Sequence, residues 1–434
     1  MSVWAKETRS GVQAVTLPGG VKLLLLPDDR FASLQVKMWY AAPLQAKRIT
    51  PAALLPLLLK RGNRKLPTQQ LMVQALEELW GAEIQAGIAT IGMGHVCYFE
   101  LDLTDPRFLP GAGEAIIPRG IQLLVDLVSD PLLPGGSFAE KTFREEQQIL
   151  LAAQERLPSS RAAYALDRCL YAVYQGEAPG INRLGLSHEL KELTPQKMAE
   201  YYHIFRQESA LTVGVTGAFR QQEMEQVVQG ILGEHASRSL DITHAPTPHA
   251  PNPQQLTEIL PGEQSQLVLA FTSQITYSDK LSLPLAFVNG LYGAYAHSRL
   301  FRFLREEAGL AYSVSSRIDR THGTIYAMAG LSAENVVVAQ EMMQGELASI
   351  SKGNISLQEL EMTRLAMLDQ YRQLRDEPNS LLEFTYNGEL LKRRQSLSEI
   401  MTAIRGIGID DIAEAAAELR PHTSFILQES GDLC

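Results

Sequence analysis

A short motif in the second half of the chain holds the residues whose types and spacing best suit chemistry. Segment 298–314 reads SRLFRFLREEAGLAYSV. Gly309 can adopt the left-handed conformation that ends a helix, which would place Arg305 in the last helical turn and Tyr312 on the strand that follows. The arginine offers a fork of N–H donors for a carbonyl or carboxylate oxygen, and the tyrosine hydroxyl can donate beside it. The two side chains can therefore point into one space.

The same residues also allow a purely structural interpretation. Arg305 could be a solvated cation at a helix end that pairs with a neighbouring glutamate, and Tyr312 could pack beside Leu310 and Val314. From the residues alone, this structural interpretation is favoured. Four basic residues after the first predicted helix are likewise interpreted as a solvated face: Lys60, Arg61, Arg64 and Lys65.

Other chemical signatures are weak in this sequence. The nine histidines are scattered and form neither a His-Glu-x-x-His nor a His-x-x-Glu-His motif. His95 and Cys97 lie two apart on a strand-like segment and share a face, but no third ligand is near, so a packed pair is favoured over a metal site. Gly111 and Gly113 lack the preceding strand of a dinucleotide fingerprint and are predicted to form a loop. No metal or cofactor is therefore expected in this chain.

Composition and charge exclude several classes of function. The chain has 434 residues, of which 45% are hydrophobic and 20% charged, which favours a soluble globular protein of two or three domains. Its net charge of −10 argues against a nucleic acid or an anionic membrane as partner. No apolar stretch approaches the roughly 20 residues of a membrane span, and no secretory signal is recognised. With three widely spaced cysteines, which suit reduced thiols, we expect a cytoplasmic protein.

The same order of predicted elements occurs twice along the chain. Each half has an early strand, a helix after it and a closing strand. The paired segments are 33–40 and 266–271, 51–61 and 283–307, and 211–215 and 424–428. Ser137 with Glu140, and Ser356 with Glu359, have the spacing of a capping box at the start of a long helix. This recurrence predicts an internal duplication.

The predicted fold is α+β, with two related domains. Each domain is expected to contain an antiparallel-rich sheet with helices packed on one face. A segment rich in proline and polar residues separates the halves and is interpreted as a linker. The predicted boundaries are 1–235 for the first domain, 236–256 for the linker and 257–434 for the second domain.

The motif around Arg305 resembles the carboxy-terminal domain signature of the insulinase/pitrilysin zinc peptidases, which include mitochondrial processing peptidase and its bacterial two-chain relatives. The resemblance extends along nearly the whole chain, because the duplicated domains, the linker and the motif occur in the family order. The segment 76–82, LEELWGA, is similar to bacterial inactive members of the family. The resemblance implies that Arg305 and Tyr312 bind the substrate backbone near the scissile bond, and that the chain forms half of a clamshell.

The first half departs from the family where catalysis should occur. Active members carry His-x-x-Glu-His on the first helix, with two zinc ligands and the general base. Here the two ligand positions are Ala53 and Leu57, and the base position is Pro56. The third ligand position aligns with Ala153, or with Glu155 if the register slips. Hydrocarbon side chains have no lone pairs for a metal, so this chain is expected to bind no catalytic zinc and to be no enzyme by itself.

The resemblance therefore implies a heterodimer. A homologous, zinc-binding catalytic subunit would be the partner, a peptide would be the substrate, and this chain would supply Arg305 and Tyr312. Two alternatives stay open: a structural scaffold or peptide-holding protein without proteolytic activity, and, with less support, a homodimeric enzyme with unusual metal ligands. A neighbouring gene for a homologue with the intact motif would favour the heterodimer.

Overall fold

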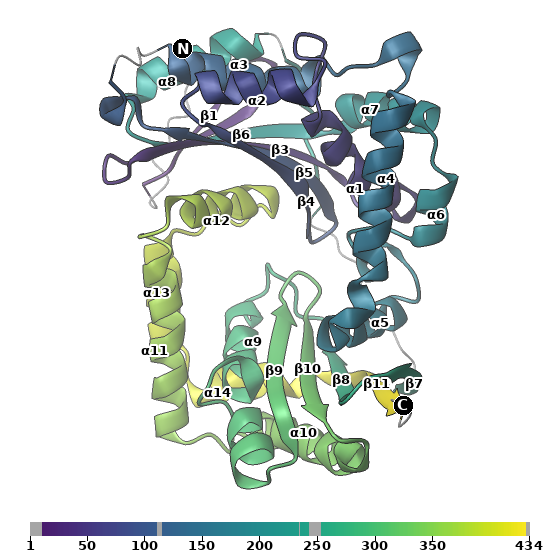
Figure 1. Ribbon diagram of the computed structural model, residues 1–434. Coiled ribbons are helices and arrows are strands. Elements are labelled where there is room, and N and C mark those ends of the chain that lie inside the picture. The colour runs from purple at the N-terminus through teal and green to yellow at the C-terminus, as the bar shows by residue number, and fades with distance from the viewer. Residues whose placement is uncertain (1–10, 111–114, 234, 243–252, 431–434) are drawn as a thin grey trace. The chain divides into compact units, whose positions relative to one another are not determined.

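The computed structural model describes residues 11–110, 115–233, 235–242 and 253–430 (Figure 1). The chain forms two compact units, and neither is continuous in sequence. The first comprises Met1–Gln154, Arg183–Thr243 and Leu374–Ser396, and the second comprises Glu155–Asn182, His244–Gln373 and Leu397–Cys434. The loop predicted around Gly111 and Gly113, and residues 243–252 of the predicted linker, lie outside the described residues.

The first unit contains a six-stranded sheet in the order β1-β2-β6-β3-β5-β4. Its strands are β1 (Gln13–Thr16), β2 (Lys22–Pro27), β3 (Ser33–Pro43), β4 (Glu83–Ile91), β5 (Gly94–Thr104) and β6 (Ala210–Gly217). β2 and β6 are parallel, whereas the other pairs are antiparallel. β3 alternates as predicted, with Leu34, Val36, Met38 and Tyr40 buried on one face.

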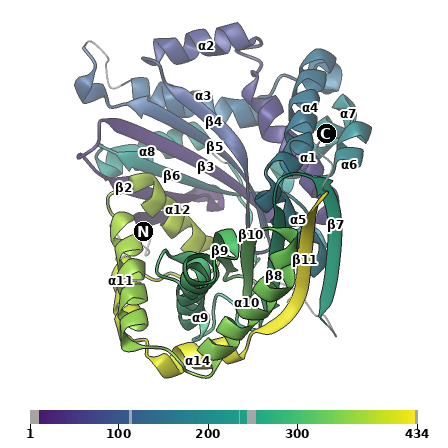
Figure 2. The same ribbon diagram turned by 60° about the horizontal axis from the view of Figure 1, so that its bottom comes forward.

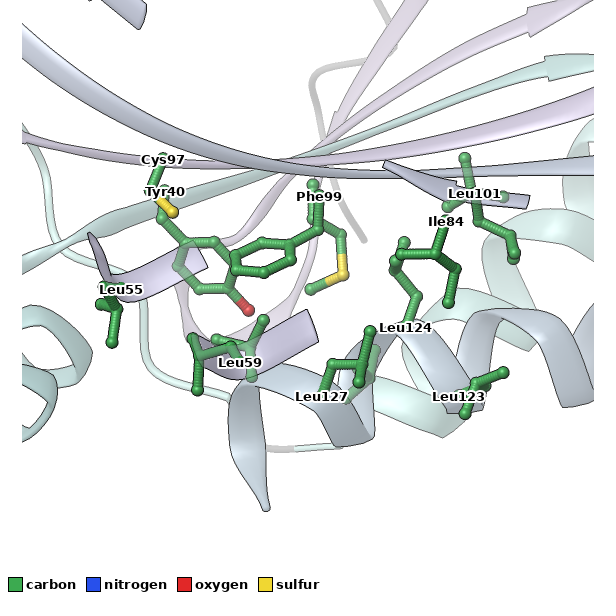
Figure 3. Packing of buried hydrophobic residues seen from close by; sticks show 14 of the residues in the cluster. Tyr40, Leu55, Leu59, Ile84, Cys97, Phe99, Leu101, Leu123, Leu124 and Leu127 are labelled. Carbon is green, nitrogen blue, oxygen red and sulfur yellow. The ribbon is translucent and has the colours of Figure 1, made fainter. Parts of the chain in front are cut away.

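Helices α1 and α3 cover this face of the first sheet. Leu59 of α1 and Leu124 and Leu127 of α3 meet Tyr40 and Phe99 in one hydrophobic core (Figure 3). Burying a leucine or phenylalanine side chain is worth about 1.5–3 kcal/mol, so this layer is a main source of stability. The helices of the unit are α1 (Ala46–Lys60), α2 (Gln69–Glu78), α3 (Ile116–Ser129), α4 (Glu140–Glu155), α6 (Ser187–Glu192), α7 (Pro195–Glu208), α8 (Gln221–Leu232) and α12 (Pro378–Leu390).

The opposite face of the first sheet is covered by α12, which comes from the second half of the sequence. Tyr386 of α12 stacks on Trp39 of β3, with ring centroids 4.4 Å apart and an interplanar angle of 8°. Lys37, the neighbour of Trp39 on β3, forms ion pairs with Glu100 of β5 at 2.9 Å and Glu383 of α12 at 2.5 Å. The odd-numbered residues of β3 thus bind α12, while the even-numbered residues face α1 and α3.

The second unit contains a five-stranded sheet in the order β7-β11-β8-β10-β9. Its strands are β7 (Gln254–Pro261), β8 (Ser265–Thr272), β9 (Ala311–Asp319), β10 (Thr324–Leu331) and β11 (Arg420–Ser430). β7 and β11 are parallel, and the other pairs are antiparallel.

Helices cover both faces of the second sheet. On one face α9, α10 and α14 pack together (Figure 2). On the other, Ala165, Cys169 and Val173 of α5 recur at a spacing of four residues and pack against buried residues of β8 and β11. The helical elements of the unit are α5 (Arg161–Val173), α9 (Ser282–Asn289), the π-helical η6 (Gly290–Ala294) and η7 (Phe301–Glu307), α10 (Val336–Ser351), α11 (Leu357–Gln373), α13 (Leu397–Gly406) and α14 (Ile409–Ala417).

The two sheets confirm the predicted α+β fold and its duplication. The order β2-β6-β3-β5-β4 corresponds strand by strand to β7-β11-β8-β10-β9, and the parallel pair, β2 with β6 or β7 with β11, stands first in each of these two orders. The unit boundaries add an exchange to this pattern: α5 from the first half belongs to the second unit, and α12 from the second half belongs to the first. Each sheet therefore has helices of its own half on one face and a helix of the other half on the opposite face.

Two local predictions differ from the structure. α4 begins at Glu140, so Ser137 lies too far from the first turn to cap it, whereas Ser356 and Glu359 form the expected capping box. The helix predicted at 283–307 is interrupted at Tyr295, which is extended (φ −116, ψ 161). Short 3-10 turns occur at Pro18–Gly20, Pro106–Phe108, Pro134–Gly136, Leu157–Ser159, Ala178–Gly180 and Ala333–Asn335. None of the helices in the described ranges combines the length and apolarity needed to cross a membrane.

Candidate functional site

The positions that match the zinc motif lie on α1 and face hydrocarbon. Ala53 is 5% exposed and belongs to the core cluster, Pro56 is buried, and Leu57 packs against that cluster from its edge. Ala153 is half-buried on α4, and Glu155 is exposed at the end of that helix. Within the described ranges, no three His, Cys, Asp or Glu side chains converge on a point that could hold a metal ion. The side chains at these positions do not provide the nitrogen, sulfur or oxygen ligands that zinc needs.

Buried polar contacts hold α1 in place beside this degenerate motif. The hydroxyl of Thr50 is fully buried, donates to Glu189 of α6 and accepts from the backbone N–H of Leu186 at 3.0 Å. Gly185 lies so close that a Cβ there would come within 2.6 Å of the Cα of Thr50. These contacts fix α1 against α6 and the segment before it.

The basic residues at the end of α1 lie at the surface, as expected: Lys60, Arg64 and Lys65 are exposed, and three of the four cations also form ion pairs. Arg61 bonds to Glu146 and lies 3.3 Å from Glu145, both on α4. Arg64 pairs with Asp130, and Lys65 pairs with Asp126 at 2.7 Å. Because the carboxylates of α3 and α4 are close in space but distant in sequence, local reasoning did not find these pairs.

His95 and Cys97 share a face of β5, as predicted, and line a small cavity of about 20 Å³ together with Ala52 of α1. That volume suits a single water molecule. Burial lowers the pKa of His95 to about 4, and burial also raises the pKa of the Cys97 thiol well above its usual value. Near neutral pH the pair is an uncharged imidazole and an undissociated thiol, so the cysteine is neither a metal ligand nor a nucleophile.

Arg305 lies in the last turn of η7, as the sequence predicted, and its guanidinium is exposed. It lies over the Phe301 ring, with its central carbon 4.8 Å from the ring centroid. In the described part of the chain it has no hydrogen bond or ion pair, and the nearby Glu307 lies 3.7 Å from Arg302 instead. The pairing with a neighbouring glutamate that the structural interpretation required is therefore not made.

Tyr312 lies on β9 at an irregularity in the strand pairing. Gly330 of β10 pairs with Ser313, but the next residue, Leu331, pairs with Ala311, so Tyr312 is the extra residue of a β-bulge. A bulge turns the side chain of the extra residue away from the regular alternation. Tyr312 is 60% exposed, and no partner for its hydroxyl is found among the described residues. Instead of packing into the core, its ring presents a free donor to solvent.

A tight turn connects η7, which carries Arg305, to β9, which carries Tyr312. Gly309 has a φ of +62°, the left-handed conformation predicted for it. The backbone N–H of Ala308 donates to Phe303 at 3.0 Å, and that of Leu310 donates to Leu304 at 2.9 Å. The chain therefore leaves η7 and enters β9 through one tight turn.

Sequence reasoning missed Arg299, a buried residue two positions before η7. Its buried guanidinium donates to Glu359 at 2.9 Å and also to the carbonyl oxygen of Asn354. Burial opposes ionisation of Glu359, but hydrogen bonds from Arg299 and Ser356 outweigh it and lower the pKa of this carboxyl. The capping-box glutamate thus also fixes the segment that carries Arg305. The signal was present in the recognised motif, because Arg299 is its second residue.

Comparisons with known proteins agree with this fold. The family model described as "Peptidase M16 inactive domain" matches residues 192–367, a range that includes Arg305 and Tyr312. The chain is 24% identical over 413 residues to "Probable inactive metalloprotease YmfF" of Bacillus subtilis, which covers 94% of this chain and 96% of that protein. "Uncharacterized zinc protease YmxG" of the same organism is 23% identical over 304 residues, covering 68% and 73%.

Solved structures share the whole fold. A conserved protein from Enterococcus faecalis V583 has a TM-score of 0.89 at 25% identity and covers 98% of this chain and 100% of its own. A peptidase M16 inactive domain from Pseudomonas fluorescens has a TM-score of 0.79 at 15% identity, covering 98% and 99%. Fold, motif and relatives together define a homologue of the insulinase-like (M16) zinc peptidases. More narrowly, the family model and the relative that matches along nearly the whole length support a non-catalytic homologue of that group.

Proposed function

We propose that this chain is the non-catalytic, substrate-binding subunit of a heterodimeric, cytoplasmic insulinase-like zinc metallopeptidase. The partner would be a homologous chain with an intact His-x-x-Glu-His motif, and zinc is expected in that partner. The observation that carries the proposal is a contrast within one molecule. The metal-ligand positions on α1 are hydrocarbon, while the donors of Arg305 and Tyr312 are exposed and have no hydrogen-bond partner among the described residues.

The proposed role of this chain is to hold the peptide backbone. The Arg305 guanidinium is permanently charged, and its N–H groups donate to a substrate carbonyl oxygen. The Tyr312 hydroxyl donates to a second backbone oxygen. The stack on Phe301 limits the freedom of the Arg305 side chain, so less entropy is lost when a peptide binds. Correct placement of a scissile bond lowers the barrier to reaction even when the positioning group touches no metal.

The proposal is tested by assembling the complex. The chain is co-expressed with a homologue that carries the intact motif, the complex is isolated by size-exclusion chromatography, and cleavage of a peptide library is measured. A hydrogen bond from a charged donor is worth about 1.5–3 kcal/mol, so an Arg305→Ala complex is expected to lose about 10- to 100-fold in kcat/KM. Tyr312→Phe removes a neutral donor, and a loss of about 2- to 10-fold is expected.

Arg302→Ala is the matched control. Arg302 lies on the same π-helical turn and also stacks on an aromatic ring, 4.1 Å from the Phe303 centroid, but Glu307 is near its guanidinium. This variant is expected to cleave within about twofold of the parent, as for most exposed substitutions. Cleavage by the Arg305→Ala complex at the parental rate would refute the proposed role. A stable complex that cleaves no peptide would favour the scaffold alternative instead.

A further inference from the structure

A cavity of about 260 Å³ lies within the first unit, where the start of α12 meets the start of β3 and the end of β6. Gln35 of β3 and Thr216 of β6 pair directly with each other on the sheet face that α12 covers (Figure 1). The polar side chains that line the cavity come from these three elements: Ser33, Gln35, Thr216, Glu377, Asn379 and Ser380. The volume exceeds that of several water molecules, so a ligand of a few non-hydrogen atoms can enter.

Two buried oxygen atoms at this cavity have no partner. Thr216 is only 3% exposed, and no hydrogen bond of its hydroxyl is found among the described residues. The Oδ1 atom of Asn379 is also buried and has no partner there. A buried polar group without a hydrogen bond is costly. Two such groups at one cavity indicate that a bound molecule bonds to them.

The amide nitrogens of the lining are turned toward carboxylates. Nδ2 of Asn379 donates to Glu100 of β5 at 2.7 Å, and Nε2 of Gln35 donates to Asp102 of the same strand at 3.4 Å. These bonds fix the orientation of both amides. The free atom of Asn379 is therefore its carbonyl oxygen, which can only accept a hydrogen bond.

The start of α12 adds further acceptors and a negative charge. The hydroxyl of Ser380 donates to the Glu377 carboxylate at 2.8 Å, so the Ser380 oxygen offers only lone pairs to a ligand. The positive end of the helix dipole opposes a cation here, but the carboxylate of Glu377, at the N-cap, offsets it.

No lysine, arginine or histidine is found among the described residues that line the cavity. Two cations that are close in sequence to the lining residues are already paired. Arg30 lies 2.7 Å from Asp28, and Lys37 lies 2.9 Å from Glu100. The chain as a whole has a net charge of −10, which attracts cations. A ligand that fits must therefore bring hydrogen-bond donors, and a positive charge favours it.

We propose that this cavity binds a primary ammonium group, carried either by a lysine side chain of a peptide or by a free alkylamine. An ammonium group has three donors and no acceptor, which matches Thr216 Oγ1, Asn379 Oδ1 and the Glu377 carboxylate. The site lies in the first unit, so the inference does not depend on the role proposed for Arg305 and Tyr312.

The test measures binding to the full chain by isothermal titration calorimetry. The probes are butylammonium chloride, its uncharged counterpart 1-butanol, and N-acetyl-lysine N-methylamide. Hydrogen bonds from a charged donor are about twice as strong as neutral ones, so butylammonium is expected to bind at least about tenfold more tightly than 1-butanol. The third probe distinguishes the sources: tighter binding than butylammonium supports a peptide lysine, and equal or weaker binding supports a free amine.

Two substitutions locate the bound group. Thr216→Val keeps the shape of the side chain and removes a hydroxyl that has no partner in the protein, so it should fold normally and weaken butylammonium binding by about fivefold. Glu377→Gln removes the charge and should weaken binding by about tenfold. Thr212→Val, on the same face of β6 but outside the cavity lining, and Glu200→Gln, exposed on α7, are the matched controls and should bind like the parent.

Three results would overturn the proposal. If no probe binds, the cavity holds water only. If 1-butanol binds as tightly as butylammonium, the cavity does not recognise an ammonium group. If folded Thr216→Val or Glu377→Gln, checked by circular dichroism, binds butylammonium as the parent does, the amine binds elsewhere.

Discussion

Truncation of one tyrosine in α12 should destabilise the first unit, although that helix belongs to the second half of the sequence. Tyr386 is 2% exposed and stacks on Trp39, which is itself 3% exposed. Gly214 of β6 makes room for the indole, because a Cβ there would lie 2.6 Å from the ring of Trp39. The Tyr386→Ala variant would therefore leave a cavity that neither the strand nor the helix can fill.

The expected loss follows from the size of the buried ring. Replacing a buried aromatic residue by alanine costs about 3–5 kcal/mol, and the stacked pair adds about 0.5–1.5 kcal/mol beyond the area effect. The Tyr386 hydroxyl is buried and finds no partner among the described residues, and this unfavourable burial offsets part of the sum. We expect the free energy of unfolding to fall by about 4 kcal/mol. Tyr386→Phe keeps the ring and removes only the hydroxyl, so it should be neutral or slightly stabilising.

Urea denaturation of both variants measures this difference, and hydrogen exchange shows where it acts. In Tyr386→Ala, amide protection should fall in β2, β3 and β6, which lie next to α12, while β8 and β11 of the second unit keep theirs. The reasoning would be refuted if the free energies of unfolding of the alanine and phenylalanine variants differed by less than about 1 kcal/mol, because removal of a well-packed ring destabilises a protein by more than that. Loss of protection confined to β8 and β11 would likewise contradict the assignment of α12 to the first unit.

Three further predictions follow from buried contacts and from the degenerate motif. Gly185→Ala should lower the free energy of unfolding by about 2–4 kcal/mol, because φ is +80° and the new Cβ would clash with the backbone of Thr50. Gly81→Ala is the control: φ is +76° but the space around it is open, so the free energy of unfolding should fall by only about 1–2 kcal/mol. Burial disfavours the charge of Asp319, but its bond to His322 prevails and lowers its pKa to about 2, so its contribution to stability is present above pH 4 and is lost as the pH falls from about 4 to 2. Because 37% of that side chain is exposed, the loss should be only about 1 kcal/mol, and an Asp319→Asn variant should lack it in acid titrations followed by circular dichroism. Metal analysis of the purified chain should find far less than stoichiometric zinc, and a tightly bound equivalent would contradict the account of α1.

Local sequence patterns predicted much of the fold because they depend on nearby residues. The alternation along β3 identified its buried face, and the spacing of Ser356 and Glu359 identified the start of α11. The repeated order of elements was enough to predict two related sheets. Gly309 likewise placed the turn before β9, because few other residues adopt a positive φ without strain.

The remaining features depend on contacts between distant residues. α5 and α12 each pack on the sheet built mainly from the other half, and no local pattern shows which sheet an amphipathic helix will cover. The ion-pair partners of Arg61 and Lys65 lie on α4 and α3, far from these two residues in the sequence. The bulge at Tyr312 arises from the pairing of β9 with β10, so it could not be predicted from the sequence of β9 alone.

The same junction in the two halves shows why one of them carries an exposed tyrosine. In each half a helical segment ends at a positive-φ glycine, Gly81 or Gly309, and an edge strand begins two residues later. Three residues after the first glycine, Ile84 is 3% exposed and lies in the core, in an uninterrupted pairing of β4 with β5. At the matching position Tyr312 is 60% exposed, because the bulge reverses the direction of the side chains at the start of β9. Since the strands alternate in step again further along, a single irregularity is enough to turn a core position into an exposed hydrogen-bond donor without changing the rest of the sheet.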